Sequence, residues 1–469
     1  MPQALTRDVE SLREEVAGQV LVPQDPGYDD ARRVWNGGID RYPAAILRPV
    51  TAADVSAGIR FAREHRLELS VRGGAHAGSG SSVTEGGLMI DLSRMRDVTV
   101  DPVARRCLVG GGATLADRDT ATQEHGLAAP GGIVGHTGVG GITLGGGMGW
   151  LTRKHGLTLD GLLSAEVVVA DGRVLRASND ENTDLFWAVR GGGGNFGVVT
   201  NFEFQLHPVG PLVDFGLFFW PLERGADVLR LTKDLFASLS RDMNIIVAGI
   251  NAPPEPFVPK DHWFRPGYAL LMTGFGPPEE HSTIVERIRA QLPPLFELVT
   301  EMPYVQLQQM FDEANAFGFL AYDKTLYVED LSEAVISVVT EHLPRKSSPL
   351  TPLFVYRLDG AYSDVGEEDT AFGGDRTPRY VIFLIALADN TEMFEADRSW
   401  VRSFWAALLP HATGIGSYVN GEAEFAQGQV LNSYGLDKYE RLRRIKATYD
   451  PENAFHLNAN IPPADGNHR

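Results

Sequence analysis

Residues 71–80 read VRGGAHAGSG and follow an apolar, strand-like segment at residues 67–71. Glycine adopts positive φ freely and lets another molecule lie directly against the backbone. A loop of this composition after a strand presents a row of free backbone N–H groups, which is the arrangement that holds a pyrophosphate. The stretch therefore predicts a phosphate-bearing cofactor with His76 beside it.

A second glycine block supports this interpretation. Residues 131–150 read GGIVGHTGVGGITLGGGMGW. Ordinary helices and strands do not tolerate this density of glycine, so we expect irregular backbone here. Such backbone would run close against something large and flat, or against something anionic.

Composition limits the class of protein. The chain has 469 residues, enough for two or three domains, and its 43% hydrophobic content is that of a packed globular protein. The formal net charge of −19 without a basic run argues against nucleic acid or an anionic membrane surface as a partner. The N-terminus lacks the apolar core of a signal peptide, and the longest apolar run, residues 380–388, is too short to span a bilayer. We therefore expect a cytoplasmic protein.

The single cysteine, Cys107, excludes an intrachain disulfide and is expected to be a small buried side chain. Histidines are too scattered to predict a metal site. The letters Gly192-x-Gly194-x-x-Gly197 match a dinucleotide fingerprint, but that fingerprint needs a strand before it and a helix after it. Here the order is reversed, so we reject a nicotinamide site.

Local patterns divide the chain into regions. Residues 54–65 predict an amphipathic helix, with Val55, Ile59 and Ala62 on one side, ahead of the strand and the first glycine loop. Residues 165–170 and 174–177 predict a hairpin around Asp171-Gly172. Residues 434–449 predict one helix, stopped by Asp450-Pro451, with an extended tail after it.

Between residue 212 and about residue 415 glycine becomes rarer, and strands alternate with long helices. The expected helices are 225–239, 281–292 and 391–409, and the expected strands are 245–250, 268–273, 353–358 and 380–387. This pattern fits a second α+β region with a mainly antiparallel sheet.

Taken together, four ordered stretches resemble one family, the berberine-bridge-enzyme-like FAD-linked oxidases of the vanillyl-alcohol-oxidase superfamily. They are the helix before VRGGAHAGSG with that loop, GLAAPGGIVGHTGVGGITLGGGMGWLTRKHGLTLD, DLFWAVRGGGGNFGVVTNFEF and KYERLRRIKATYDPENAFHLNANIPP. The resemblance covers nearly the whole chain. It implies an α+β fold: a two-part FAD-binding domain of the vanillyl-alcohol-oxidase type, with an inserted substrate domain built on an antiparallel sheet flanked by helices.

The resemblance also implies the boundaries of these domains. Residues 1–211 form the N-terminal part of the FAD domain, residues 212–415 the substrate domain, and residues 416–469 a segment that returns to the FAD domain. His76 matches the histidine that bonds covalently to the flavin 8α carbon. Some members add a second link through a cysteine, but Val134 stands at that position, so we expect a covalent link through His76 only. Ala75 departs from the glycine that the family usually has.

By the same resemblance, the cofactor-binding residues lie in the two glycine blocks, in the strand after the third stretch and in the tail. They are Arg72, Gly73, Gly74, Ala75, His76, Ala77, Gly78, Gly80, Thr137, Gly138, Gly140, Gly141, Ile142, Val198, Val199, Asn458 and Asn460. Thr137 falls where the family places the side chain that lines the approach of oxygen to the flavin.

The implied reaction transfers a hydride from a carbon that bears oxygen or nitrogen to flavin N5, with O2 reduced to hydrogen peroxide. A base takes the proton from the substrate. The candidates are His136, Tyr356, Tyr418 and Lys324, with Asn420 and Tyr322 in the same stretches. Some members use as the base a tyrosine that directly follows the asparagine of a Tyr-x-Asn stretch. In this chain that stretch is Tyr418-x-Asn420, and Gly421 stands where those members have the tyrosine.

Three alternatives to an oxidase stay open at this point. They are a flavin-dependent oxygenase or cyclising oxidase of secondary metabolism, a dehydrogenase that avoids O2, and a flavin-binding protein without turnover. The expected partners are a small-molecule substrate and O2. The sequence identifies neither the substrate nor the oligomeric state.

Overall fold

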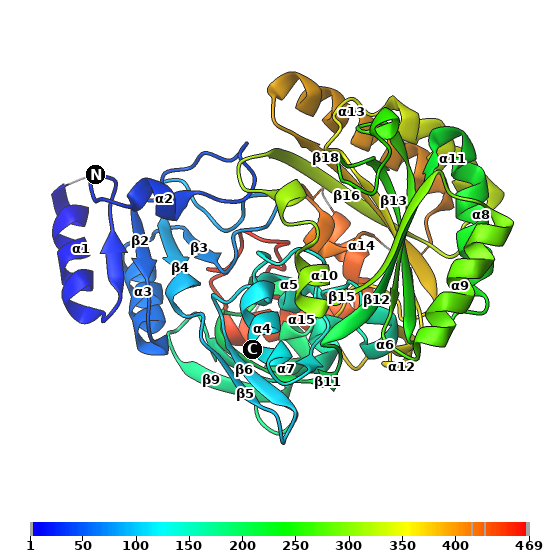
Figure 1. Ribbon diagram of the computed structural model, residues 1–469. Coiled ribbons are helices and arrows are strands. Elements are labelled where there is room, and N and C mark those ends of the chain that lie inside the picture. Colours follow the sequence, from blue (N-terminus) through cyan, green and yellow to red (C-terminus); the bar gives the residue numbers. More distant parts are fainter. Residues whose placement is uncertain (1–2, 414–415, 426–427, 466–469) are drawn as a thin grey trace.

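The computed structural model arranges the chain around three main β-sheets and one short two-stranded sheet (Figure 1). It describes residues 3–413, 416–425 and 428–465. Helices and mostly antiparallel strands are mixed along the chain, so the expected α+β class is confirmed. None of the helices in these ranges is long and apolar enough to cross a membrane. The cytoplasmic location stays a prediction.

The first sheet carries the loop that follows residue 72. Its strands, in spatial order, are β1 (Gln19–Leu21), β2 (Ala45–Arg48), β4 (Leu88–Asp91) and β3 (Leu69–Arg72). The helices beside it are α1 (Gln3–Glu15), α2 (Tyr28–Arg32) and α3 (Ala52–Glu64). A capping box between Thr51 and Asp54 starts α3, and its apolar side is buried as the spacing predicts. The glycine loop begins where β3 ends.

The second sheet is antiparallel. Its strands, in spatial order, are β5 (Val98–Asp101), β6 (Arg106–Gly110), β10 (Val198–Gln205), β8 (Leu162–Val168) and β9 (Val174–Ser178). The predicted hairpin is confirmed as β8 and β9. Helices α4 (Leu115–Gln123), α6 (Thr152–His155) and α7 (Thr183–Val189) and the short pair β7 (Leu127–Ala128) and β11 (His207–Pro208) complete this region. Cys107 is buried in its core, as expected.

The prediction of irregular backbone throughout residues 131–150 is wrong, because a seven-residue helix, α5 (Val139–Gly145), forms inside the block. Tertiary packing explains one of the glycines of this helix, Gly140. A Cβ added at Gly140 would lie 3.2 Å from the carbonyl oxygen of Gly111, so the missing side chain lets α5 lie close to the loop after β6. Close approach of the backbone therefore outweighs low helix propensity here.

The third sheet is the largest. Its seven strands, in spatial order, are β15 (Phe296–Pro303), β12 (Leu212–Pro221), β14 (Pro266–Gly274), β13 (Met243–Asn251), β17 (Leu353–Leu358), β18 (Arg379–Ala388) and β16 (Leu320–Val328). All of its pairs are antiparallel. The four expected strands are confirmed, whereas β12, β15 and β16 were not foreseen.

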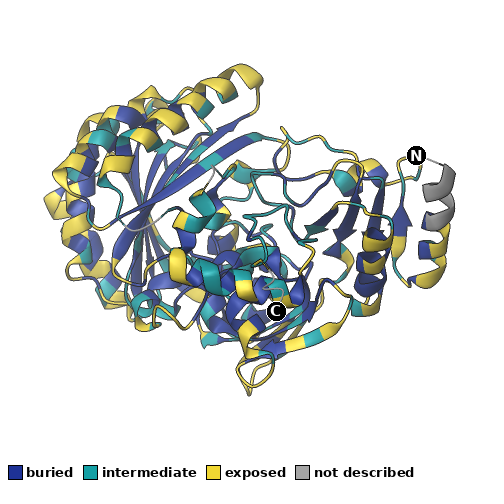
Figure 2. Cartoon of the chain, turned by 180° about the vertical axis from the view of Figure 1, so that it is seen from behind, coloured by how far each residue is buried: buried dark blue, intermediate teal, exposed yellow. Residues whose placement is uncertain are grey.

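Both faces of this sheet are buried. Side chains alternate along each strand, so that on β17 Leu353 and Val355 face one core and Phe354, Tyr356 and Leu358 face the other. The first core lies under α8 (Gly225–Phe236), α9 (Pro278–Gln291), α11 (Glu333–His342) and α13 (Thr391–Leu408), whose outer sides are exposed in Figure 2. The second core faces the glycine blocks. The short helices α10 (Tyr304–Gln309) and α12 (Ala361–Asp364) lie in connections between strands.

The C-terminal segment lies between the other parts, against the second sheet (Figure 1). The single helix predicted at 434–449 is wrong at its start: α14 (Gln429–Tyr434) ends and α15 (Leu436–Tyr449) begins at Gly435, whose φ of 74° favours glycine. The division of the chain at residues 211 and 415 stays a prediction, and residue 415 falls outside the described residues.

Candidate functional site

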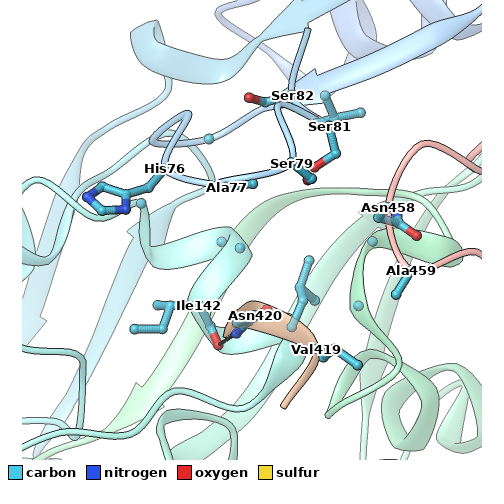
Figure 3. Close-up of a pocket in the computed structure, with 18 of the residues that line it drawn as sticks. His76, Ala77, Ser79, Ser81, Ser82, Ile142, Val419, Asn420, Asn458 and Ala459 are labelled. Carbon is cyan, nitrogen blue, oxygen red and sulfur yellow. Dashed lines mark hydrogen bonds between the residues drawn. The ribbon is translucent and has the colours of Figure 1, made fainter. Parts of the chain in front are cut away.

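A cavity of about 370 Å³ lies where the three sheets meet. Among the parts of the chain that enclose it are the loop after β3, the start of α5, the segment around η9 (Val419–Gly421), and the C-terminal tail. Figure 3 shows them around one space, with His76 and Asn458 at opposite sides of the view. The resemblance placed the cofactor against three of these segments: the loop after β3, the start of α5 and the tail.

Most of the predicted cofactor residues line this cavity. They are Gly73, Gly74, Ala75, His76, Ala77, Gly78, Thr137, Gly138, Gly140, Gly141, Ile142, Val198, Val199 and Asn458. Arg72, Gly80 and Asn460 are not among its lining residues. Arg72 turns away and donates to the Ala31 carbonyl, with Asp91 3.7 Å from its Nε. Its position indicates support for the loop rather than contact with a ligand.

The residues around the cavity fit a large cofactor with many hydrogen-bonding groups. The space beside Gly141 is open, because a Cβ added there would meet no atom within 4 Å. Among the described residues, the buried Ser82 Oγ, His76 Nε2 and Asn458 Oδ1 lack a hydrogen-bond partner. Buried polar atoms of this kind are normally satisfied, so a ligand that supplies the partners is the simplest explanation.

His76 lies in a stack of rings at one end of the cavity. Its ring centroid is 4.6 Å from that of Trp35, with the two planes 13° apart, and 5.0 Å from that of His136 on the other side. Burial, and then the neighbouring His136, lower the pKa of His76 to about 3. His76 is therefore a neutral imidazole at physiological pH.

His136, the first sequence-based candidate for the base, does not line the cavity. It stacks behind His76, its Nε2 lies 3.4 Å from the carbonyl oxygen of Asp312, and Phe317 packs against its ring at 5.5 Å. The structure therefore places His136 next to the proposed attachment residue rather than over the centre of the cavity.

Two of the predicted tyrosines do reach the cavity. Tyr356 lies on the face of β17 that looks toward the glycine blocks, and its ring packs 5.3 Å from that of Phe383. The Tyr418 oxygen accepts a 2.8 Å hydrogen bond from Gly147 N–H and a 3.0 Å hydrogen bond from the side-chain amide of Asn420. Asn420 also donates to the Ile142 carbonyl at 3.1 Å, the bond drawn in Figure 3.

Lys324 reaches the cavity only through another residue. It lies on the face of β16 that packs against α13, with its Nζ 5.1 Å from the centre of the Trp405 ring. The Nζ is 3.2 Å from a carboxylate oxygen of Glu422, and Glu422 lines the cavity. Tyr322 points to the same side and bonds Glu424 at 2.6 Å. Neither position favours direct contact with a substrate.

Sequence reasoning missed a pair of acidic side chains at this edge. Burial raises the pKa of Glu422, and burial together with Glu422 raises the pKa of Asp323 to about 7. Asp323 lies against the glycine loop: a Cβ added at Gly78 would be 2.5 Å from Asp323 Oδ1. That oxygen is buried and has no hydrogen-bond partner in the described part of the chain. Residues 78, 323 and 422 are far apart in the sequence, and no spacing pattern indicates that they lie close together in the fold.

Other lining residues were also missed. They are Ser81, Ser82, Gly193, Gly194, Gly197, Phe383 and Ala459, among others. Two signals could have found several of them: the serines continue the first glycine loop, and Gly193 and Gly194 belong to the third quoted stretch. No cluster of ligands suited to a metal ion is found in the described ranges.

Comparison with known proteins agrees with this geometry. Residues 43–178 match a family model described as an FAD binding domain, and residues 417–462 match one described as berberine and berberine like. The FAD-linked oxidoreductase pgmH of Aspergillus terreus is 30% identical over 476 residues, covering 95% of this chain and 94% of that protein. The (R)-6-hydroxynicotine oxidase of Paenarthrobacter nicotinovorans is 29% identical over 96% of this chain and 97% of its own.

Solved structures show the same fold. The 6-hydroxy-D-nicotine oxidase of Arthrobacter nicotinovorans superposes with a TM-score of 0.83 and 26% identity, over 96% of this chain and 98% of the other. The BBE-like 1 protein of Physcomitrella patens superposes with a TM-score of 0.87 over 98% of this chain and 100% of the other. At 22% identity, this similarity shows a shared fold only.

Proposed function

Because the chain belongs to the berberine-bridge-enzyme-like family of FAD-linked oxidoreductases, we propose that it oxidises a small organic molecule at a carbon that bears oxygen or nitrogen. When bound, FAD supplies the hydride acceptor at N5 and the centre at which O2 is reduced to hydrogen peroxide. The observation that carries this proposal is the cavity between the two glycine blocks, with Tyr356 and Tyr418 among the residues of its wall.

The glycine loop after β3 and the start of α5 hold the cofactor from two sides. Gly73, Gly74 and Gly78 of the loop carry no side chain, so that backbone N–H groups can approach a phosphate, and Gly141 leaves open space where α5 meets the cavity. Asn458 brings an unsatisfied amide oxygen from the tail. We assign the covalent link to His76, the imidazole at one end of the cavity.

We assign to Tyr418 the role of the base that accepts the substrate proton. Its oxygen accepts two N–H donors, and both stabilise negative charge on that oxygen. The residue after Asn420 is Gly421, so no tyrosine is available there as an alternative base. The site also has no room for one, because a Cβ at Gly421 would already lie 2.5 Å from Thr325 Cγ2. Tyr356 lines the same space and orients the substrate.

The side chains that line the cavity favour a substrate with an apolar ring. Met148, Phe383 and Phe425 line it together with Tyr356 and Tyr418. Aromatic walls of this kind bind flat apolar groups through stacked and edge contacts. The name of the hydroxynicotine relative fits such a substrate, whereas the name of a second relative, the xylooligosaccharide oxidase of Thermothelomyces thermophilus, indicates a sugar.

The test mixes the purified flavoprotein, without oxygen, with 1-phenylethylamine, 1-phenylethanol and xylobiose in turn. We expect the oxidised flavin absorbance to fall with at least one of the two aromatic compounds, and to return on admission of O2 with one hydrogen peroxide formed per substrate. Reduction followed by slow reoxidation would identify a dehydrogenase instead. A flavin that dithionite reduces but none of a broad panel of amines, alcohols and sugars reduces would indicate a protein without turnover.

A further inference from the structure

The side-chain amide of Asn36, a buried residue between α2 and β2, joins two distant parts of the molecule. Its Nδ2 donates to the Gly78 carbonyl at 2.7 Å and to the Ala321 carbonyl at 2.9 Å. Its Oδ1 accepts from the Ala321 N–H at 3.1 Å and from the Gly38 N–H at 3.0 Å. All four hydrogen bonds that an amide side chain can form are therefore present.

The third sheet fixes the orientation of this amide. Ala321 lies in β16, an edge strand of the sheet, and both of its backbone polar groups bond the Asn36 side chain. The next residue along the chain is tied to the same region, because the Gly37 N–H donates to the Phe319 carbonyl at 2.8 Å. The sheet thus sets the position of the amide, and the amide sets the position of the Gly78 carbonyl in the glycine loop.

The bond to Gly78 also orients the N–H group of the following residue. In a trans peptide unit the C=O and N–H bonds point in opposite directions. The unit between Gly78 and Ser79 is trans, and its C=O points at Asn36. The Ser79 N–H therefore points away from Asn36.

The residue before Asn36 acts on the loop in the same way. The Trp35 N–H donates to the Ala75 carbonyl at 2.9 Å, so the His76 N–H also points away from this segment. Neither the His76 N–H nor the Ser79 N–H donates to another group in the described part of the chain. Both residues line the cavity. Backbone N–H groups seldom lack a partner, so a ligand in the cavity is the natural acceptor for them.

We propose that Asn36 is a positioning residue for the cofactor, whose amide holds the peptide unit between Gly78 and Ser79 with its N–H toward the FAD phosphates. This inference rests on the proposed function, which places FAD in the cavity. Successive backbone N–H groups bind phosphate oxygens when they point to one side of a loop. Asn36 is not among the residues that line the cavity, so it acts on the cofactor through the loop.

Asn244 offers a matched control. It is also a buried asparagine: its Nδ2 donates to the carbonyls of Gly149 at 3.3 Å and Trp150 at 3.0 Å, and its Oδ1 accepts from the Ile245 N–H at 2.9 Å. None of these four residues lines the cavity. Leucine at either asparagine removes the amide and keeps a side chain of similar size. Both variants should lose stability, but only the Asn36 variant should lose affinity for phosphate.

The experiment titrates apoprotein with FAD and, separately, with riboflavin, which lacks the phosphates. Every protein carries His76→Ala, which keeps the backbone N–H and makes flavin binding reversible, and the protein with this change alone is the parent. Flavin fluorescence measures the two affinities. The variants are Asn36→Leu, Asn36→Asp and Asn244→Leu, and thermal unfolding of each apoprotein measures stability separately.

We expect Asn36→Leu to weaken FAD binding about 10-fold or more, the usual contribution of a hydrogen bond to a charged group, while riboflavin binding changes little. Asn244→Leu should lower the melting temperature and leave both affinities unchanged. Unchanged FAD affinity in Asn36→Leu, equal losses for FAD and riboflavin, or equal losses of FAD affinity in the two leucine variants would each overturn the inference and leave the proposed function intact. A parent protein that binds no flavin would instead refute the proposed function.

Asn36→Asp gives a signature that a change of shape alone would not give, and it supplies the test if the leucine variant does not fold. The aspartate keeps the size and one acceptor oxygen, but only its protonated form can donate to the Gly78 carbonyl. Its FAD affinity relative to the parent should therefore rise as the pH falls from 8 to 5. The parent is compared at each pH because Asp323, Glu422 and Lys324 lie at the same edge in both proteins. A ratio that does not change with pH would contradict the inference.

Discussion

The backbone N–H of Gly147 donates a 2.8 Å hydrogen bond to the hydroxyl oxygen of Tyr418, 271 positions further along the chain. The bond joins the second glycine block to the C-terminal segment at the wall of the cavity. Burial raises the pKa of Tyr418 to about 12, and the bonds from Gly147 and Asn420 act in the opposite direction. The two donors therefore keep the pKa of Tyr418 below the value that burial alone would give, and so increase the fraction of phenolate, the form that can accept a proton.

Replacing Tyr418 with phenylalanine removes the proposed base and keeps the ring. We expect the rate of flavin reduction to fall about 10²-fold or more, because general base catalysis contributes that much. Stopped-flow absorbance without oxygen measures this step directly. Tyr356→Phe is the comparison and should change substrate affinity more than the reduction rate. Equal reduction rates in wild type and Tyr418→Phe would exclude Tyr418 as the base.

The pH dependence of the same step follows from the raised pKa. A base must be deprotonated to accept a proton, and with a pKa of about 12 the deprotonated fraction of Tyr418 falls about tenfold for each pH unit below that value. The reduction rate should therefore rise with pH throughout the alkaline range. Asn420→Leu removes one of the two donors and should move the rise to higher pH. A profile that is flat above neutrality would contradict the assignment.

Substitutions at two glycines of α5 test FAD binding and structural stability separately. Gly141 faces the cavity, and a Cβ there meets nothing within 4 Å, so Gly141→Ala should stabilise the apoprotein by about 1 kcal/mol through helix propensity while weakening FAD binding. At Gly145 the Cβ would lie 2.1 Å from Asn420 Oδ1, so Gly145→Ala should displace Asn420 and lower stability. Thermal unfolding of the apoprotein and titration with FAD measure the two effects. Unchanged FAD affinity in Gly141→Ala would show that the cofactor does not use this face.

The contrast between α3 and α5 shows which parts of the fold the sequence could predict. Helix α3 and strand β3 follow from local rules, since the apolar spacing, the Thr51 cap and the glycines after the strand all lie within thirty residues. The helix α5 could not be predicted in this way. At its start, other backbone lies against two glycines: a Cβ at the N-cap Gly138 would be 2.1 Å from the backbone nitrogen of Gly74, and one at Gly140 would be 3.2 Å from the carbonyl oxygen of Gly111. Only the assembled fold contains those contacts.

The residues of the candidate site likewise divide into those that the sequence could predict and those that it could not. The glycine loops and Asn458 could be found from contiguous stretches, and most of those residues do line the cavity. Tyr356 lies on the strand expected at residues 353–358, so its place on the sheet could also be predicted. Asp323 and Glu422 could not be found, because their importance arises from β16 crossing the first glycine loop at Gly78. Lys324, next to Asp323 in the sequence, points to the opposite face of the strand.

Asp323 makes the stability of the protein depend on pH. Its pKa is raised from 3.8 to about 7 in the folded state, so between these values the folded protein holds more protons than the unfolded chain. The contribution of this group to stability is thus greatest below pH 4 and is lost as pH rises through 7. Asp323→Asn should raise the melting temperature of the apoprotein at pH 8, should have a much smaller effect at pH 4, and should flatten the fall in between. The charged groups that share this edge are Glu422 and Lys324. A constant difference in melting temperature from pH 4 to pH 8 would contradict this prediction.

The tail that carries Asn458 depends on one buried lysine. Lys446 is fully buried in α15, and its Nζ donates to the Asp450 carboxylate at 2.5 Å, to the Asn195 carbonyl at 2.7 Å and to the Phe455 carbonyl at 2.9 Å. Lys446→Met leaves a buried carboxylate without its cation, so the free energy of unfolding should fall by about 3–5 kcal/mol.

Urea unfolding at fixed FAD concentration measures this change. The double variant Lys446→Met with Asp450→Asn should recover part of the loss, because it also removes the unpaired charge. Lys233→Met serves as the control: the Lys233 ion pair with Asp330 is exposed, and such pairs contribute about 1 kcal/mol or less. Because Lys446 ties α15 to both the turn at Asn195 and the tail, its variant should also bind FAD more weakly. An effect on stability no larger than that of Lys233→Met would show that packing of the tail, rather than this buried cation, holds Asn458 at the cavity.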